Sequence, residues 1–473
     1  MTTLIKNIRT ILTLDEAGTR YQGASIIVDG PAIKAIVPNS GPEGMGEDCR
    51  SLTFEEVIDG SGMIAIPGMV NTHHHLYQTL TRNIPATADL PLFPWLTTLY
   101  DIWQGLTPED VRISALVGLG ELMKTGCTTS ADHLYVFPET VSSEFIDLEI
   151  AAAGELGLRF HPTRGSMSLG RSRGGLPPDE VVQDHETILK DSERLVEAYH
   201  DRSRYSMCRL SLAPCSPFSV TPELMRDTIN LARRLNVNCH THLAETRDEE
   251  AFCLEKFGKR PVAYAADLGW VGPDVWFAHC VHLNPEEVAI LGETRTGVAH
   301  CPVSNLKLSS GIAPILDLVR AGARVGLAVD GSASNDASDM WGEAKVAYLI
   351  QKLAHGPDGL TAEGILRMAT SGGASTLGRD DIGVLAPGMA ADIVLINSER
   401  LEFAGGLHDP PATLISTGSN HWVDTVIVNG KVTVRNGHLT GVDEEAVSWE
   451  ANRLSARLLE KARLRTGRDY LVR

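Results

Sequence analysis

Three histidines stand directly after an apolar stretch near the start of the chain. Residues 63–70 form an apolar run that predicts a buried strand, and His73, His74 and His75 follow it. Side chains alternate along a strand, so His73 and His75 point to the same side. Two imidazoles on one side of a strand end make half of a zinc site. The alternative is a run of surface histidines, which we disfavour because three histidines behind a buried strand are costly without a ligand to share.

Polar residues end several other apolar runs in the same way. Beyond residue 66, short apolar runs alternate with amphipathic stretches, and we predict eight strands: 67–72, 128–133, 159–165, 208–216, 238–245, 275–280, 297–302 and 324–331. The polar residues at the later ends are Asp132, His133, His240, His242, Glu245, His279, His300 and Asp330. Charged side chains are rarely buried without partners, so scattered core residues explain this set poorly. We predict that the strand ends converge on one cavity.

The stretches between the apolar runs predict helices. Thr107 is a suitable N-cap, Pro108 takes the first helical position, and Gly126 closes a helix that ends near residue 125. The same pattern predicts helices over 222–235 and 285–292. Alternating strands and helices imply parallel strands, and eight units match a closed (β/α)8 TIM-type barrel. The alternative is an open doubly wound sheet, which usually has fewer strands and a glycine-rich phosphate loop that this sequence lacks.

The two ends of the chain predict a second, smaller β module. Short β-rich segments near the N-terminus are broken by turns at 29–31 and 39–42. Near the C-terminus, Asn429-Gly430 joins two more strands in a predicted hairpin, and a helix is predicted over 446–465. We therefore divide the chain into an N-terminal part of a β-sandwich module (1–66), a metal-dependent catalytic barrel (67–383), and the C-terminal part of the module with a terminal helix (384–473).

The composition narrows the class of partner. The chain has 473 residues, of which 43% are hydrophobic and 22% charged, as in ordinary globular proteins. A formal net charge of −18 argues against nucleic acid or an anionic membrane as partner. The N-terminus has no signal-peptide pattern, and the eight cysteines form no paired framework. We expect a cytoplasmic homo-oligomer that acts on a small molecule.

The chain resembles the amidohydrolase superfamily over nearly its whole length. The resembling segments are 73–75, 240–245, 277–279, 329–331 and 383–395. Within the superfamily it is most similar to the metal-dependent aminohydrolases of purines, pterins and s-triazines, through 71–82, 92–96, 213–221 and 330–336. The resemblance implies one divalent metal per chain, zinc or alternatively iron, with the ligands His73, His75, His242 and Asp330.

Two choices in this ligand set rest on the resemblance. His240 and His242 face the same way on a strand, and the family motif places the ligand three residues before Glu245. Binuclear relatives bridge two metals with a carbamylated lysine or a glutamate on the fourth strand, and residues 208–216 contain neither. We therefore expect a single metal.

The resemblance also implies hydrolytic deamination of an amino-substituted N-heterocycle, such as 8-oxoguanine or a related oxopurine or pterin. Glu245 would carry protons, His279 would orient the water and stabilise the tetrahedral intermediate, and Asp330 would accept a proton or hydrogen bond. A satisfied core histidine is the alternative for His279. An s-triazine hydrolase is the alternative activity. A barrel relative without metal or activity is disfavoured because all four ligands are present.

Five residues are candidates for substrate contacts. Gln78 offers both a donor and an acceptor, which suits a lactam edge. Trp95 could stack on a flat ring, although a core tryptophan is the alternative. Arg82 follows Gln78 in the same segment, with a solvated charge as the alternative. Cys215 and Asn305 stand near strand ends.

Overall fold

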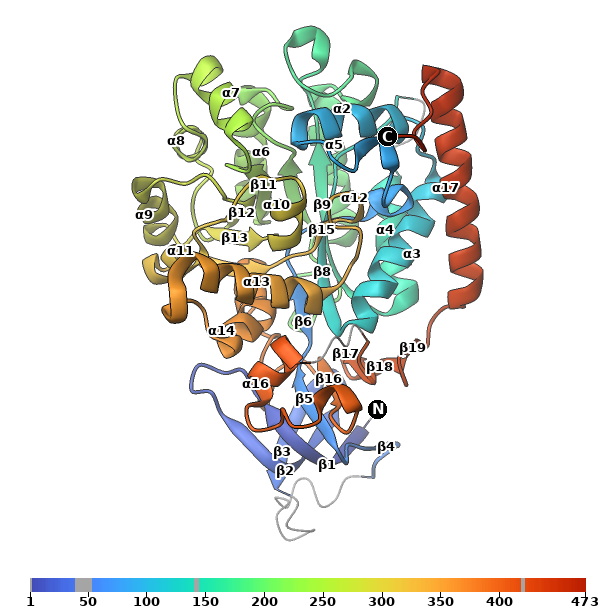
Figure 1. Ribbon diagram of the computed structural model, residues 1–473, viewed down its shortest axis with the longest axis vertical. Helices are drawn as coiled ribbons and strands as arrows, with labels where there is room; N and C mark the ends of the chain where they lie inside the picture. The colour runs from blue at the N-terminus through green and yellow to red at the C-terminus, as the bar shows by residue number, and fades with distance from the viewer. Residues whose placement is uncertain (1, 39–52, 140–143, 418–421) are drawn as a thin grey trace.

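The chain folds into a barrel of parallel strands that stands on a second sheet (Figure 1). The computed structural model describes residues 2–38, 53–139, 144–417 and 422–473. Figure 1 shows helices around the barrel strands and, below them, strands contributed by both ends of the chain. The turn expected at 39–42 lies outside the described residues.

Eight parallel strands form the barrel, each hydrogen-bonded to the next along the chain. They are β6 (Met69–Asn71), β8 (Cys127–Leu134), β9 (Arg159–Ser166), β10 (Ser211–Pro214), β11 (Cys239–Leu243), β12 (Val275–His279), β13 (Gly297–His300) and β14 (Arg324–Leu327). All eight lie within or beside the strands that the sequence predicts. These eight barrel strands carry almost only buried residues, which explains their continuous apolar runs.

The last strand meets the first and closes the barrel. The Thr72 N–H donates to the Leu327 carbonyl at 3.1 Å. Just beyond, β7 (His74–His75) pairs in parallel with β15 (Asp330–Gly331), with Asp330 opposite His74. The closed barrel is therefore confirmed and the open sheet is excluded. Closure also brings the histidines that follow the first strand beside the aspartate that follows the last one.

Helix caps set the ends of the helices that connect these strands. Thr107 accepts a hydrogen bond from the Asp110 N–H and forms a capping box at the start of α3 (Pro108–Lys124). Helices α6 (Pro222–Leu235) and α9 (Pro285–Glu293) also begin with proline behind a capping side chain, as predicted. The other α-helices are α2 (Leu92–Trp103), α4 (Phe145–Leu156), α5 (His185–Tyr199), α7 (Arg247–Phe257), α8 (Pro261–Asp267), α10 (Pro302–Lys307), α11 (Ile315–Ala321), α12 (Ser332–Asn335), α13 (Met340–His355), α14 (Ala362–Arg367), α15 (Gly373–Thr376), α16 (Pro410–Ala412) and α17 (Glu444–Thr466).

Among the described residues, the second sheet draws nine strands from both ends of the chain. They are β1 (Thr2–Leu12), β2 (Arg20–Asp29), β3 (Ala32–Pro38), β4 (Glu56–Asp59), β5 (Met63–Pro67), β16 (Ile393–Asn397), β17 (Thr425–Val428), β18 (Lys431–Arg435) and β19 (His438–Leu439). Strand β5 pairs with β1 on one side and with β16 on the other, which joins the two halves. At the predicted hairpin, Asn429 and Gly430 have φ of 51° and 82°, as a type I′ turn requires.

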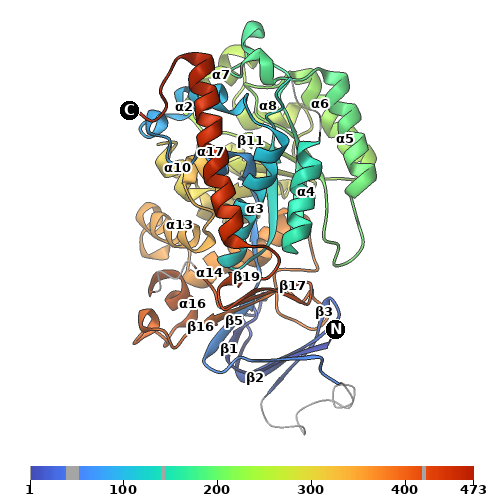
Figure 2. The same cartoon turned by 90° about the vertical axis from the view of Figure 1, so that its right-hand side faces the viewer.

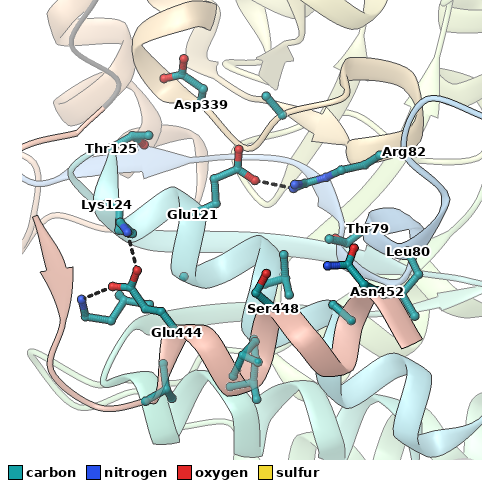
Figure 3. A pocket seen from close by; sticks show the side chains of 18 of the residues that line it. Thr79, Leu80, Arg82, Glu121, Lys124, Thr125, Asp339, Glu444, Ser448 and Asn452 are labelled. Atoms are coloured by element: carbon teal, nitrogen blue, oxygen red, sulfur yellow. Dashed lines mark hydrogen bonds and ion pairs between the residues drawn. The ribbon is translucent and has the colours of Figure 1, made fainter. Parts of the chain in front are cut away.

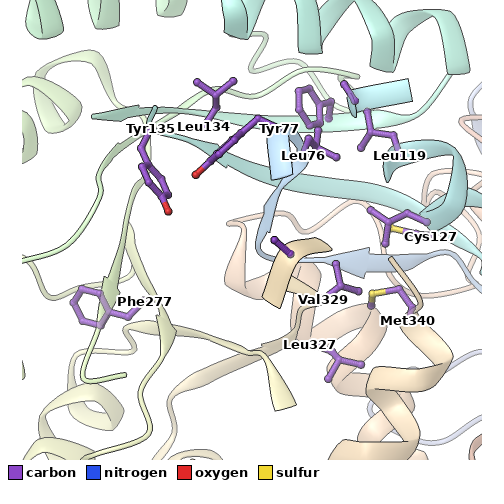
Figure 4. Close-up of a cluster of buried hydrophobic side chains, with 14 of the residues drawn as sticks. Leu76, Tyr77, Leu119, Cys127, Leu134, Tyr135, Phe277, Leu327, Val329 and Met340 are labelled. Atoms are coloured by element: carbon purple, nitrogen blue, oxygen red, sulfur yellow. The ribbon is translucent and has the colours of Figure 1, made fainter. Parts of the chain in front are cut away.

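The main apolar core fills the space between the barrel and its helices. Figure 4 shows Leu76 and Tyr77 close to Leu134 and Tyr135 within this buried cluster. Leu76 and Tyr77 belong to the short helix η2 (Leu76–Thr81), so this packing fixes the segment that follows the histidines. The core thereby positions the beginning of the site.

The terminal helix α17 runs along the outside of the barrel (Figure 2). It packs against α3, and its Ser455 Oγ donates to the Leu80 carbonyl of η2 at 2.7 Å. Beyond the helix, the Ala86 N–H donates to the Tyr470 carbonyl at 3.2 Å. Within the four described segments, we find no helix long and apolar enough to cross a membrane.

Candidate metal and catalytic site

The four predicted metal ligands lie together at the carboxyl end of the barrel. His73 Nε2 is 3.2 Å and His75 Nε2 is 3.3 Å from the same Asp330 oxygen, Oδ1. His242 Nε2 is 3.0 Å from His75 Nε2. All four side chains are buried. Residues from β11 and from the junction of the first and last strands therefore converge on one point.

Hydrogen bonds at the far ring nitrogens fix how two of these histidines are protonated. His75 Nδ1 donates to the His133 carbonyl, and His242 Nδ1 donates to the Cys215 carbonyl, both at 2.7 Å. A carbonyl only accepts, so each ring carries its proton on Nδ1. In the neutral rings, both Nε2 atoms then hold lone pairs that face each other at 3.0 Å. Such an arrangement is repulsive unless a cation lies between them.

His240 fixes the position of the ring proton on a third histidine, His73. His240 Nδ1 donates to the Trp276 carbonyl at 3.0 Å, so its Nε2 accepts from His73 Nδ1 at 2.8 Å. His73 Nε2 is thus left with a lone pair, and it is buried without a hydrogen-bond partner. The His240 Nε2 lone pair is therefore occupied, whereas the His242 Nε2 lone pair remains free for a metal. His74 points away and contacts Ser338 Oγ at 3.0 Å.

The donor set fits a divalent metal of the zinc type. Imidazole nitrogens and a carboxylate oxygen are ligands that zinc takes, and the supporting carbonyls are typical of histidine ligands. Burial lowers the pKa of His73 and His242 well below the ordinary value, which favours the neutral rings that a metal needs. His133 adds another lone pair: its Nε2 donates to the Ala213 carbonyl at 2.9 Å, and its Nδ1 is buried without a partner.

Two serine hydroxyls hold Asp330 in place through its second carboxylate oxygen, Oδ2. Ser304 Oγ donates to Asp330 Oδ2 at 2.6 Å and Ser334 Oγ at 3.1 Å. These bonds leave Oδ1 facing His73 and His75. Sequence reasoning missed both serines, although Ser334 lies in the segment 330–336 that carried the family resemblance.

His279 and Glu245 stand beside this cluster. His279 Nε2 lies 3.6 Å from Glu245 Oε2 and 4.0 Å from Asp330 Oδ2. Asn305 Oδ1 accepts from His279 Nδ1 at 2.9 Å and orients the ring. Burial alone would lower the pKa of His279, but the nearby carboxylates Glu245 and Asp330 raise it above the ordinary value. Burial raises the pKa of Glu245 to about 7, despite the opposing effect of His279.

Glu249 holds the turn that carries Glu245. Its carboxylate accepts from the N–H groups of Ala244 and Glu245 at 2.9 and 2.8 Å. The sequence contains a signal for Glu249 that the prediction did not use. Thr246 and Glu249 have the spacing of an N-cap and the third helical position at the start of α7.

Several residues at the ends of the site strands have left-handed backbone conformations. The φ angles of Ala244, His279 and Asp330 are 55°, 74° and 62°. Side chains other than glycine adopt this region at a cost of roughly 1–2 kcal/mol per residue. The strand ends are therefore bent to aim these groups, and the surrounding hydrogen bonds must hold them there.

A narrow cavity of about 30 Å³ lies over this cluster. Gln78, Trp95 and Cys215 line it, together with Glu245 and His279. Its cover includes Leu92 and Leu96 from α2, Phe218 and Leu308, and Tyr135 forms part of its wall. The cavity thus combines apolar walls with a few polar groups, and its volume is about that of one water molecule.

Two polar atoms of residues that line this cavity are buried without partners, Gln78 Oε1 and Trp95 Nε1. Gln78 packs closely on strand β15, since a Cβ atom at Gly331 would lie 2.0 Å from Gln78 Oε1. An unpaired acceptor and an unpaired donor are costly unless a ligand satisfies them.

Arg82 and Asn305 lie outside the lining of this cavity. The Arg82 guanidinium binds the Glu121 carboxylate and donates to Ser332 Oγ at 3.3 Å. Figure 3 shows this ion pair in a different cavity, of about 680 Å³, between α3 and α17. Asn305 contacts His279, as described above. The structure gives Arg82 an ion pair and Asn305 an orienting contact, and the substrate contacts expected of them from the sequence stay predictions.

Comparison with known proteins identifies the class. Residues 64–433 match the Amidohydrolase family, a span that includes every site residue described above. The chain therefore belongs to the Amidohydrolase family, as the sequence motifs predicted.

Relatives within this family act on nitrogen heterocycles. The chain is 47% identical to 8-oxoguanine deaminase from Pseudomonas aeruginosa, over 94% of this chain and 96% of that protein. It is 36% identical to hydroxydechloroatrazine ethylaminohydrolase from Pseudomonas sp. strain ADP, over 97% and 96% of the two chains. The crystal structure of atrazine chlorohydrolase from Arthrobacter aurescens TC1 complexed with zinc matches with a TM-score of 0.90 at 33% identity, covering 96% and 100% of the two chains.

Proposed function

We propose that this protein is a metal-dependent aminohydrolase that converts 8-oxoguanine and water into urate and ammonia. The observation that carries the proposal is the convergence of three imidazole lone pairs and the Asp330 carboxylate beneath a narrow cavity lined by Gln78 and Glu245. The 47% identity to 8-oxoguanine deaminase supports the choice of ring.

His73, His75, His242 and Asp330 would hold one divalent metal, zinc or alternatively iron. When bound, such a metal acts as a Lewis acid that makes a coordinated water a nucleophile near neutral pH. Asp330 would bind the metal through Oδ1, which faces His73 and His75, and would accept a hydrogen bond or proton at Oδ2, which lies 4.0 Å from His279 Nε2.

Glu245 would move the protons. A neutral aminoheterocycle must gain a proton on a ring nitrogen before water attacks it readily, and the leaving amine needs a second proton. The raised pKa of Glu245, about 7, matches a group that both accepts and gives a proton at neutral pH. His279, oriented by Asn305 and 3.6 Å from Glu245, would stabilise negative charge on the attacked carbon's oxygen.

Gln78 and Trp95 would recognise the ring. The free Gln78 Oε1 suits a ring N–H, and the free Trp95 N–H suits a carbonyl oxygen. The aromatic and aliphatic residues that line the cavity would move apart to admit the ring, and would then cover its flat faces and exclude water. Cys215 contributes to the same lining.

The test is ammonia release from purified, metal-analysed protein across guanine, 8-oxoguanine, isoxanthopterin, cytosine and hydroxytriazines. We expect the highest kcat/KM with 8-oxoguanine, and urate as its product. Ammonia release from the other rings alone would contradict the proposed substrate while leaving the class of reaction intact.

An s-triazine hydrolase is the second candidate, favoured by the relatives that act on atrazine derivatives. The ligands do not distinguish leaving groups, so identification of chloride, alkylamine or ammonia among the products decides between the two. A barrel without metal or activity fits the converging lone pairs poorly, since a bound divalent cation would satisfy all of them at once.

We further propose a cytoplasmic homo-oligomer. The described cysteines are free and mostly buried, which suits a reducing compartment. On α17, Trp449 and Leu464 expose 67% and 72% of their surface, and such apolar side chains support an interface between copies. Light scattering of the purified protein would show the state, and a monomer at micromolar concentration would contradict the oligomer.

A further inference from the structure

A second cluster of histidines lines a cavity at the opposite, amino-terminal end of the barrel. The cavity measures about 260 Å³ and opens beside the beginnings of β9, β10 and β11. Its polar lining includes His161, His200, Arg202, Arg209 and Asn238. None of the described residues that line it is an aspartate or a glutamate.

His161 presents a hydrogen-bond donor to this cavity. Arg379 Nη1 lies 3.3 Å from His161 Nε2, and a guanidinium only donates. His161 Nε2 therefore accepts, and the ring proton is on Nδ1. No described residue accepts a hydrogen bond from that Nδ1–H. The His161 side chain is 2% exposed and lines the cavity, so its Nδ1–H is available to a small ligand there.

The ring proton of His200 can be assigned in the same way. The Leu210 N–H donates to His200 Nδ1 at 3.0 Å, so the proton of the neutral ring is on Nε2. Burial and the positive charge of Arg202 lower the pKa of His200, and burial and neighbouring arginines lower that of His161. Both rings are thus neutral donors in a region of positive potential.

The two arginines of the lining donate to uncharged groups, and the carboxylates Asp201, Asp380 and Asp381 act on Arg209 only from a longer distance. Arg209 donates to the Ser206 hydroxyl and, over 3.3 Å, to the Ser203 carbonyl, and Arg202 donates to the Leu235 carbonyl. Neither forms an ion pair with a described carboxylate. By contrast, Arg379 is paired with both oxygens of Asp381, at 2.8 and 2.9 Å.

We propose that this cavity binds a small tetrahedral oxyanion of the phosphate or sulfate type. Two histidines, two arginines and Asn238 line this space, none of the described lining residues is a carboxylate, and an oxyanion supplies only acceptors. Asn238 Nδ2 also donates to the Leu377 carbonyl at 3.1 Å. Because the site lies at the amino-terminal end of the barrel, its ligand stabilises the fold and leaves turnover unchanged.

Isothermal titration calorimetry and thermal unfolding in sodium phosphate, against sodium chloride at equal ionic strength, test this site. We expect phosphate to bind and to raise the Tm of the full-length, metal-loaded protein in a concentration-dependent way. The same measurements are made in parallel with sulfate and with guanosine monophosphate. Tighter binding of the nucleotide would assign the site to a phosphate ester, and equal binding would assign it to free phosphate.

Arg209→Met removes one charge from the cavity, and Arg234→Met is its matched control. Arg234 is an exposed arginine of α6 that pairs with Glu193 outside the cavity. We expect Kd for phosphate to rise at least ~10-fold in Arg209→Met, the effect of losing a charge-assisted hydrogen bond, and to stay constant in Arg234→Met. Equal phosphate binding by both variants, or no binding at 10 mM in the unaltered protein (about 2.7 kcal/mol of binding free energy at 25 °C), would overturn the proposal.

Crystals soaked in tungstate give an answer that does not depend on a variant. An anomalous peak within hydrogen-bond distance of His161 Nδ1 and Arg209 would support the site. A soaked crystal with no peak there would overturn it.

Discussion

The two ends of the barrel both gather buried histidines, yet they present opposite chemistry. At the carboxyl end, carbonyl groups accept from Nδ1 of His75 and His242 and leave lone pairs on Nε2. At the amino end, N–H groups donate to His161 and His200 and leave ring N–H donors facing the cavity. The partner of the remote ring nitrogen, and not the residue type, therefore decides whether a histidine cluster suits a cation or an anion.

Among the changes that test this comparison, metal removal should have the largest effect on activity. We expect chelation to abolish ammonia release, and one equivalent of divalent metal to restore it, because His73, His75, His242 and Asp330 form a single site. Metal analysis with activity assays measures both. Phosphate binding at the amino end should survive the loss of metal, and two metals per chain at full occupancy would refute the single-metal site.

Glu245→Gln tests the chemistry at the carboxyl end. The change keeps size and hydrogen bonding but prevents proton transfer, so we expect kcat to fall at least ~10²-fold with metal content and fold unchanged. Steady-state kinetics and metal analysis provide the measurement. A near-normal kcat would assign proton transfer to another group such as His279, and loss of metal would mean that Glu245 is a ligand.

His240→Phe removes the acceptor that fixes the ring of His73. We expect metal affinity to fall roughly 10- to 100-fold, as for other residues that orient a histidine ligand. His200→Phe is the matched control from the amino end and should leave metal affinity unchanged. Competition with a chromophoric chelator measures both variants, and equal affinities would show that the His73–His240 contact has no influence on the metal.

Gln78→Ala should have the mildest consequence of the four, because it alters substrate recognition and leaves the metal and the proton transfer in place. The loss of one buried hydrogen-bonding side chain should cost about 1–3 kcal/mol in kcat/KM, mainly through recognition, with metal content unchanged. Kinetics on the best substrate measure the change. Unaltered kcat/KM would remove Gln78 from the substrate site, and phosphate binding at the other end serves as an internal control for folding.

The barrel could be predicted from the sequence because its signals are local. Buried parallel strands give continuous apolar runs, and caps such as Thr107 mark the helices to within a residue or two. Consecutive parallel pairing then puts the strand ends at one face. The convergence of His73, His242 and Asp330 follows from these rules.

The finer assignments depend on tertiary contacts that spacing does not encode. His240 and His242 share one face of β11, and both donate through Nδ1 to a backbone carbonyl. Only the partner of Nε2 separates them: His73 Nδ1 donates to His240, whereas the His242 Nε2 lone pair faces His75. Arg82 ends the short helix η2, and the position of Glu121 on α3 draws its side chain away from the narrow cavity. Such choices depend on residues far away in the sequence.

The left-handed turns at Ala244, His279 and Asp330 have a consequence for protein engineering. A designer who copied only the four ligands onto another eight-stranded barrel would place them on straight strand ends, where their side chains would diverge. The transplantable unit is larger: it comprises the ligands, the bent turns and the groups such as Glu249 that hold them. A recipient scaffold must also tolerate the conformational strain of those turns, so a very stable barrel is the better host.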